Sequence, residues 1–299
     1  MEKIGRKIYL VAILCFVWGA LWAAEPIERG FVEVAEGRLY YEAQGSGEAL
    51  IFVHGHSLDR RMWREQIPHF ATRYRVITYD ARGYGRSSKQ REGYLFTHAD
   101  DLIALMDRLG IERAHLVGLS MGGFIVGDLV AIHPERLLSA TMAEGVIRST
   151  PSIHEAMTEE EISQKEEAIK ALKKKGVRRY KKEWYATLMQ GGSQVKRIAR
   201  PLWQMLRDWD CWQPLHHEVH CYYAREAMAV LQQRKPTLPC LYISGQRPQK
   251  SRPNPPRMMQ FTPNGRFEVI EDAGHLLNME RPESFNRAVE SFLDEFSLK

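Results

Sequence analysis

The sequence predicts an α/β fold, in which helices flank a mostly parallel sheet and a helical segment is inserted into it. From Phe31 onwards, short apolar runs alternate with helical patterns, which is typical of parallel strands joined by crossover helices. Between about residues 147 and 236 this alternation stops, and no run there is typical of a strand. We therefore expect one α/β domain over residues 25–299, carrying a helical cap at about 147–236.

Length and composition fit one such domain. The chain has 299 residues, of which 44% are hydrophobic and 26% charged, as in an ordinary globular protein. It is too short for two independent enzyme domains. The formal net charge of +5 is mild and no broad basic stripe is present, which argues against a nucleic-acid partner.

The predicted strands begin with a hairpin that turns at Glu36-Gly37. Each later strand is a short apolar run that ends at a glycine, a polar residue or a turn. The predicted strands are 32–35, 39–43, 49–53, 74–79, 114–119, 137–142, 238–244 and 267–270.

The predicted helices lie between these strands. One is expected over 62–71, and Thr97 caps the next, in which Leu102, Leu105 and Met106 recur at helical spacing until Gly110 ends it. Another helix follows Ser120 directly, and an amphipathic helix over 282–296 closes the chain.

The predicted cap is charged in its first half and aromatic in its second. The charge runs 159–161 and 173–175 are typical of solvated helix faces. The aromatic residues indicate either an apolar binding cleft or the packing of the cap on the core; they are Trp203, Trp209, Trp212, Tyr222 and Tyr223.

The N-terminus has the layout of a secretory signal peptide. A basic stretch over 1–7 precedes an apolar run over 8–23, and small residues follow. Residues 1–24 are thus predicted to be a signal peptide, or else a signal anchor held in the membrane by residues 8–23. Either alternative predicts an exported protein, periplasmic or extracellular.

The cysteines exclude a disulfide framework. Cys15 lies in the predicted leader, and three cysteines remain. Cys211 and Cys221 form a disulfide or stay reduced, while Cys240 lies in a strand-like run and is expected to be a buried thiol. Because neither a CxxC nor an HExxH spacing occurs, we predict no structural metal.

The strongest chemical feature is the segment Gly118-Leu119-Ser120-Met121-Gly122, a G-x-S-x-G pattern between a predicted strand and a predicted helix. This context forces a sharp turn that only residues without a side chain tolerate on either side of the serine. The turn exposes the Ser120 hydroxyl and directs the backbone N–H of Met121 into the site. We predict Ser120 as a nucleophile and Met121 as one oxyanion-hole donor.

A second donor is expected at the end of an earlier strand, in His54-Gly55-His56. Acyl transfer needs two preorganised N–H groups for the developing oxyanion. We assign this role to the backbone N–H of His56. The side chains of His54 and His56 are expected to be structural or to face the substrate.

The general base is predicted at His275. It follows the last strand in Ala273-Gly274-His275 and precedes the final helix, in the chain order Ser, acid, His. A serine hydroxyl needs a neutral imidazole within hydrogen-bond reach to become a nucleophile.

These motifs, together with the stretch from Asp80 to Ser87, resemble the α/β-hydrolase superfamily. The similarity covers roughly residues 31–146 and 238–298. Within that superfamily, residues 61–88 and 118–123 look like those of esterases and enol-lactonases. A serine at the turn weighs against the haloalkane dehalogenase and epoxide hydrolase relatives, which place an aspartate there.

The chain departs from the superfamily pattern at the acid of the triad. The resemblance implies an acid after the strand ending at Ser244, but no carboxylate occurs between Gly245 and Phe267. We assign the acid to Glu144, directly after strand 137–142, where some superfamily members carry it. Asp272 and Asp80 are minor candidates.

The sequence thus predicts a serine esterase that forms an acyl-enzyme on Ser120 and takes a small-molecule ester or lipid. Alternatives of the same fold are a lactonase or a carbon–carbon bond hydrolase. An alternative of another class is a non-catalytic ligand-binding homologue. No cofactor is implied, and the predicted leader is the one feature that indicates membrane association.

Overall fold

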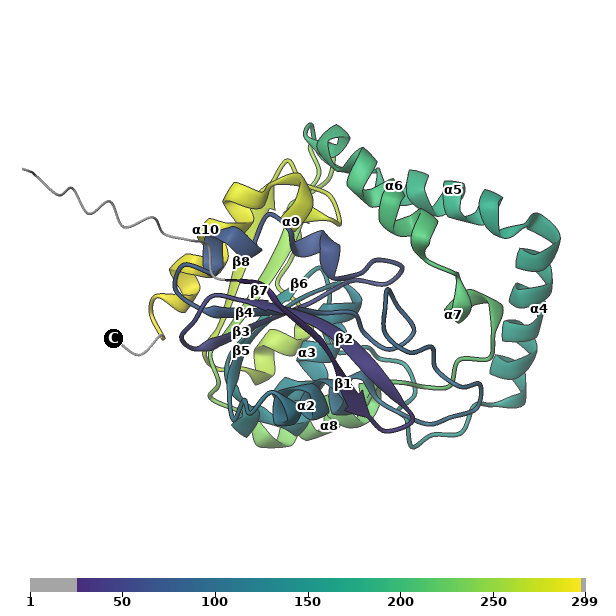
Figure 1. Cartoon of the computed structure of the whole chain (residues 1–299), viewed down its shortest axis with the longest axis horizontal. Helices are drawn as coiled ribbons and strands as arrows, with labels where there is room; N and C mark the ends of the chain where they lie inside the picture. Colours follow the sequence, from purple (N-terminus) through teal and green to yellow (C-terminus); the bar gives the residue numbers. More distant parts are fainter. Residues whose placement is uncertain (1–25, 297–299) are drawn as a thin grey trace, which may run out of the picture.

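A computed structural model describes residues 26–296, so the predicted leader lies outside the described residues. Eight strands form one sheet in the order β1-β2-β4-β3-β5-β6-β7-β8 (Figure 1). β2 pairs antiparallel with β1 and β4, and all other neighbours are parallel. The predicted fold class is therefore confirmed. The strands are β1 (Glu28–Val34), β2 (Gly37–Gln44), β3 (Ala49–Val53), β4 (Arg75–Tyr79), β5 (Ala114–Leu119), β6 (Leu137–Ala143), β7 (Cys240–Gln246) and β8 (Gly265–Glu271).

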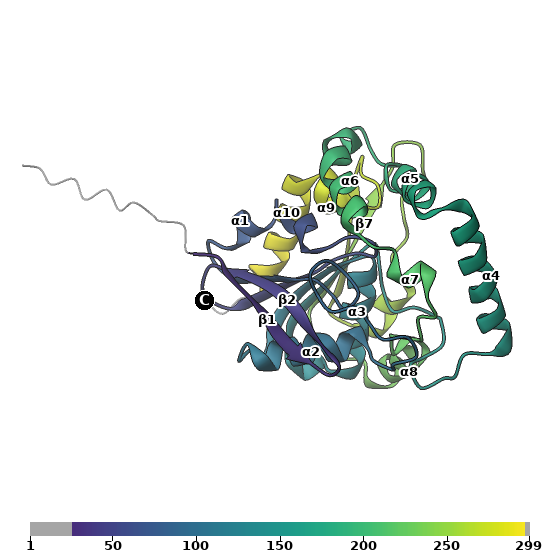
Figure 2. The ribbon, with the colours of Figure 1, turned by 45° about the vertical axis from the view of Figure 1, so that its right-hand side comes forward.

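Helices cover both faces of the sheet. α2, α3 and α8 lie on one face, and α1, α9 and α10 lie on the other (Figures 1 and 2). The helices are α1 (Ile67–Phe70), α2 (His98–Arg108), α3 (Met121–Ile132), α4 (Glu159–Lys175), α5 (Val177–Leu188), α6 (Ala199–Asp208), α7 (Trp212–Leu215), α8 (Ala224–Arg234), α9 (Leu277–Glu280) and α10 (Pro282–Leu293). Four 3-10 turns join them at Arg60–Trp63, Pro134–Arg136, Val195–Ile198 and Arg257–Phe261.

The centre of the core is made by β3 and β5. Every residue of these two strands is buried, as expected for parallel strands covered by helices on both faces. Because parallel strands end at one edge of the sheet, the residues that follow β3, β5, β6 and β8 are brought together there.

The predicted helix over 62–71 is wrong. The chain instead forms a 3-10 turn at Arg60–Trp63, capped by the Asp59 side chain, and then the short helix α1. Pro68 lies in the first turn of α1. Proline lacks the N–H that a continuous helix requires and disfavours helical backbone in the residue before it, so the helix restarts there.

The segment between β6 and β7, residues 144–239, is here called the insertion. It contains α4 to α8 and no strand, and the structure describes all of it. In Figure 2, α4 to α7 lie beyond the carboxyl edge of the sheet, whereas α8 packs on α3. Thr158 and Glu161 form a capping box at the start of α4, and Gly176, with φ 86°, ends that helix. The charge runs at its two ends are exposed and complement the helix dipole.

Polar contacts join the insertion to the core. The Trp184 indole donates to Ser57 Oγ at 2.7 Å, and the Gln213 amide donates to the Gly83 carbonyl at 2.9 Å. Arg61 pairs with Asp208 at 2.9 Å on the exposed side of the same seam. The insertion is therefore held against the loops that follow β3 and β4.

Cys211, Cys221 and Cys240 are all buried and free, so the alternative of a disulfide between the first two is not realised. Cys211 opens α7, whereas Cys221 packs beside the start of α2. Cys240 is buried in β7 as predicted. In residues 26–296, no helix is both long and apolar enough to cross a lipid bilayer.

Candidate active site

Ser120 occupies the sharp turn between β5 and α3. Its backbone has φ 56° and ψ −114°, a conformation that L residues rarely adopt. The turn requires glycine on both sides, because a Cβ on Gly118 would lie 2.2 Å from the Gly122 oxygen and one on Gly122 would lie 2.0 Å from the Val53 oxygen. The N–H of Ser120 donates to the Ala143 carbonyl at 2.8 Å, which fixes the turn against the end of β6.

Glu144 lies beside His275. Its Oε2 is 3.4 Å from His275 Nδ1, and both side chains remain partly exposed. The other carboxylate oxygen, Oε1, accepts a 2.6 Å hydrogen bond from the Gly245 N–H. Glu144 itself has φ 51°, and this backbone conformation follows directly on the last residue of β6. The ends of three parallel strands thus define this pair: Glu144 directly follows β6, Gly245 lies near the end of β7, and β8 precedes His275.

The two minor acid candidates bind elsewhere. Asp272 accepts from the Ser193 N–H at 2.7 Å and pairs with Arg281. Asp80 is fully buried and accepts from the backbone N–H groups of Arg60 at 3.0 Å and Arg86 at 2.9 Å. Neither carboxylate contacts His275 in the described chain, so Glu144 is the acid that the structure places against this imidazole.

His54 is a structural residue. Its Nε2 accepts from the Ala81 N–H at 2.9 Å, so Nδ1 carries the proton and donates to the Gly55 carbonyl at 2.8 Å. Burial lowers the pKa of this imidazole and keeps it neutral. Both nitrogens are used in holding the turn after β3 against the loop after β4.

His56 follows the same turn and lies at the seam between core and insertion. Its Nδ1 is 2.7 Å from the Tyr84 hydroxyl, and its ring makes edge contacts with Trp184 and Trp209. Burial, with the neighbouring His54 second, lowers the pKa of His56 to about 4, so the ring is neutral at pH 7. A Cβ built on Gly55 would be 3.5 Å from that of Ser120, which places this turn next to the serine.

The backbone N–H groups of His56 and Met121 are unpaired. Within residues 26–296, neither donates a hydrogen bond to another group of the protein. Met121 is the first residue of α3, where the helix leaves its N–H groups without intrahelical partners. The two groups are therefore free to bind an anionic oxygen.

The aromatic residues of the insertion mainly pack against one another and against the core. Trp209 is 5% exposed and contacts His56, Trp212 stacks on His216, and Tyr222 packs between His98 and Phe124. Trp184, which the sequence did not single out, contacts both Ser57 and His56. No local pattern marks Trp184, because its role depends on how α5 docks on the core.

Two hollows on this seam lie apart from the serine. The larger holds about 270 Å³ between the loop at 83–89 and residues 208–210. The other holds about 240 Å³ and is lined by residues of the Arg60–Trp63 turn and of α6. Neither lining includes Ser120 or His275, so these hollows do not define the site around the serine.

Comparisons with known proteins agree with this fold. The family model described as alpha/beta hydrolase fold matches residues 48–282. The chain is similar to 3-oxoadipate enol-lactonase 2 of Acinetobacter baylyi, with 29% identity over 85% of this chain and 91% of that protein.

Two solved structures share the architecture. The enol-lactonase from Burkholderia xenovorans superposes with a TM-score of 0.64 and 25% identity, covering 89% of this chain and 100% of that one. A thermophilic esterase from Thermogutta terrifontis gives a TM-score of 0.68 at 24% identity, covering 91% of this chain and 100% of that one, which shows the fold alone.

Proposed function

The chain belongs to the alpha/beta hydrolase fold family and is a hydrolase of that fold, and we propose that it cleaves carboxylic esters through an acyl-enzyme on Ser120. The observation that carries this proposal is the conjunction of a strained serine turn with a close contact between an imidazole and a carboxylate at the same edge of the sheet. In the proposed triad, Ser120 is the nucleophile, His275 the general base and Glu144 the acid.

The proposed reaction has two halves. His275 takes the Ser120 proton as Oγ attacks the ester carbonyl carbon, and the same imidazole then protonates the leaving alcohol. A water molecule, deprotonated by His275, then attacks the acyl carbon; the bond between that carbon and Ser120 Oγ breaks, the imidazolium returns its proton to Oγ, and the carboxylic acid leaves. Each half passes through a tetrahedral oxyanion, which the N–H groups of His56 and Met121 stabilise, and a single such donor is worth about 3 kcal/mol in the transition state.

Glu144 is suited to orient the imidazole. Because Gly245 occupies Oε1, the remaining oxygen faces His275 Nδ1 and favours the tautomer with the proton on that nitrogen. The other nitrogen, Nε2, is then free to accept the serine proton. The carboxylate also stabilises the imidazolium that forms in each half-reaction.

The relatives support an ester bond as the target. One relative and one structural neighbour are named enol-lactonases, and a lactone is a cyclic ester that the same steps open. A lactone is therefore the second candidate substrate, and carbon–carbon bond cleavage is a weaker alternative. A non-catalytic ligand receptor has no use for the pair of Glu144 and His275.

We also propose that the chain is exported. This proposal rests on the basic and apolar residues of segment 1–24, which lies outside the described residues. A signal peptide that is removed and an anchor that is retained both remain compatible with it. The helical cap over about 147–236 is likewise proposed to cover the substrate.

The proposal is tested with the purified full-length chain in a mild detergent. We expect hydrolysis of p-nitrophenyl acetate, butyrate and palmitate, with a chain-length profile that separates an esterase from a lipase. Hydrolysis of a γ-lactone, assayed in parallel, distinguishes a lactonase from an esterase. Ser120→Ala should abolish turnover and labelling by a fluorophosphonate, while Ser284→Ala, on α10, should retain both.

Turnover that persists in Ser120→Ala would exclude Ser120 as the nucleophile. If the wild type hydrolyses neither ester nor lactone and takes no fluorophosphonate label, the non-catalytic receptor replaces the esterase.

A further inference from the structure

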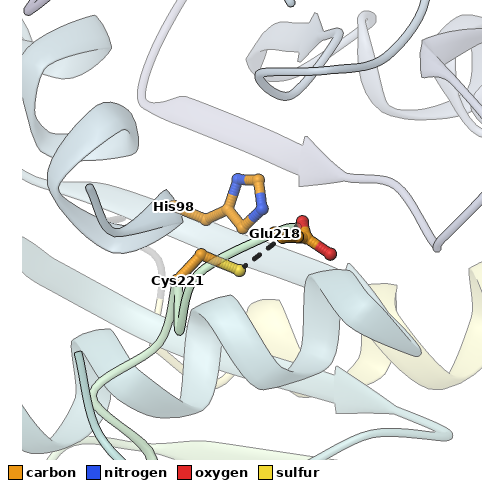
Figure 3. A group of neighbouring side chains, drawn as sticks. All are labelled: His98, Glu218 and Cys221. Carbon is orange, nitrogen blue, oxygen red and sulfur yellow. Dashed lines mark hydrogen bonds between the residues drawn. The ribbon is translucent and has the colours of Figure 1, made fainter. Parts of the chain in front are cut away.

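A second cluster of reactive side chains contains neither Ser120 nor His275. His98 is the first residue of α2, and Glu218 and Cys221 lie on the segment between α7 and α8 (Figure 3). One potential ligand atom from each residue, an imidazole nitrogen, a carboxylate oxygen and the thiol sulfur, lies within 4.8 Å of the other two. The Cys221 sulfur is 3.9 Å from Glu218 Oε1.

His98 is the least satisfied member of this cluster. Its residue is 1% exposed, and neither Nδ1 nor Nε2 has a hydrogen-bond partner. The ring is held by edge contact with Phe96 and by Tyr222. Burial lowers the pKa of His98 to about 3, so the imidazole is neutral and one nitrogen presents a lone pair. A buried imidazole with no partner is rare, and such a group requires an explanation.

We propose that His98, Glu218 and Cys221 bind one divalent transition metal ion of the zinc class, which fastens the segment between α7 and α8 to the start of α2. Imidazole nitrogen, thiolate sulfur and carboxylate oxygen are the three ligand types that zinc takes in proteins. The thiolate selects against magnesium and calcium, which prefer oxygen ligands. A water molecule completes the tetrahedron.

The charges balance at such a site. When the metal binds, the Cys221 thiol releases its proton to solvent, and the negative charges of this thiolate and of the Glu218 carboxylate neutralise the divalent ion. Burial raises the pKa of both groups, while Arg148 acts on both and Lys165 on Glu218 in the opposite direction. For tetrahedral zinc the ligand atoms stand roughly 3.5 Å apart, so the cluster closes by about 1 Å on binding.

The backbone already brings the two segments together. The N–H of His98 donates to the Cys221 carbonyl at 3.1 Å, and the N–H of Tyr223 donates to Asp128 of α3 at 2.8 Å. The metal would therefore stabilise a contact between the start of α2 and the insertion that the backbone hydrogen bonds already make. His98 is far in the sequence from Glu218 and Cys221, so a search for CxxC or HExxH could not find this set of ligands.

The experiment is a titration of chelator-treated full-length protein with Co²⁺, followed by absorption spectroscopy and by competition with Zn²⁺. We expect one equivalent of Co²⁺, a thiolate-to-metal charge-transfer band, and tetrahedral d–d bands that Zn²⁺ abolishes. Cys221→Ser should remove the charge-transfer band, and Glu218→Gln should weaken binding on the order of 100-fold. The matched control is Cys240→Ser, which replaces another buried free thiol and should leave the spectrum unchanged.

Far-ultraviolet circular dichroism of each variant establishes that it is folded. Zn²⁺ should also raise the Tm of the wild type but not that of Cys221→Ser. The proposal is overturned if Co²⁺ gives no charge-transfer band, or if the band survives in folded Cys221→Ser. Weak binding of several equivalents without the band would identify adventitious surface binding and would also overturn it.

Discussion

Glu144 and His275 meet across the carboxyl edge of the sheet, with Oε2 3.4 Å from Nδ1, although 131 positions separate them in the chain. The carboxylate follows β6, and the backbone N–H of Gly245, near the end of β7, holds it. Among the described residues, the carboxylate beside this imidazole therefore comes from the end of β6, and β7 supports it through a backbone hydrogen bond.

This relationship predicts the effect of Glu144→Gln. The amide is nearly isosteric but cannot stabilise the imidazolium, so we expect kcat to fall by about 10³- to 10⁴-fold while the fold is kept. The measurement is steady-state hydrolysis of p-nitrophenyl butyrate, with circular dichroism to verify folding.

Asp272→Asn is the matched control for that variant. Asp272 binds Ser193 and Arg281 rather than His275, so its variant should keep kcat within about tenfold of the wild type. If Asp272→Asn loses activity as severely as Glu144→Gln, the assignment of the acid to Glu144 is wrong.

The strands were largely predictable from the sequence because they are buried on both faces. β3 and β5 match their predicted ranges residue for residue, since each is a continuous apolar run that ends at a polar or glycine-rich turn. The predicted helix over 62–71 is not continuous, because Pro68 interrupts a segment whose apolar residues have helical spacing.

The surroundings of the candidate site were less predictable. The positions of Ser120, Glu144 and His275 follow from strand ends, which the sequence marks. The contacts of Trp184 with Ser57 and of Glu144 with Gly245 join segments that are distant in sequence, and no local periodicity encodes them. The same applies to the proposed ligands His98, Glu218 and Cys221.

The glycine on the far side of Ser120 predicts a stability effect. A methyl group at Gly122 would meet the Val53 oxygen at 2.0 Å, and neither backbone segment can move without disturbing β3. We expect Gly122→Ala to lower the free energy of unfolding by more than about 3 kcal/mol, measured by urea denaturation. At Gly55 the nearest atoms are 3.5 Å from an added Cβ, so Gly55→Ala should cost less than about 1 kcal/mol. Equal losses in the two variants would contradict the close approach at Gly122.

The proposed leader is tested by deletion of residues 1–24. The first strand begins at Glu28, so the deletion removes nothing from the sheet. We expect a folded protein with kcat unchanged within about twofold, since no leader residue belongs to the proposed triad. Expression of the intact chain with a reporter enzyme at its C-terminus, active only outside the cytoplasm, checks export. A reporter that stays inactive with the intact leader would refute the export proposal.

Asp128 predicts a pH dependence of stability. It lies on α3, where burial raises the pKa of its carboxyl from an ordinary value of 3.8 to about 7. The backbone N–H groups of Tyr223 and Ala224 lower this pKa, whereas the nearby Asp100 and Glu226 raise it further. Because the folded state holds its proton more tightly than the unfolded chain does, the contribution of Asp128 to stability is fully present below pH 4. It is lost as pH rises from 4 to 7, by about 4 kcal/mol at most. Asp128→Asn, which does not titrate, is the reference. Urea denaturation should show the wild type losing stability relative to this variant between pH 4.5 and pH 8, and a difference that stays constant over that range would show that Asp128 is ionised in the folded protein.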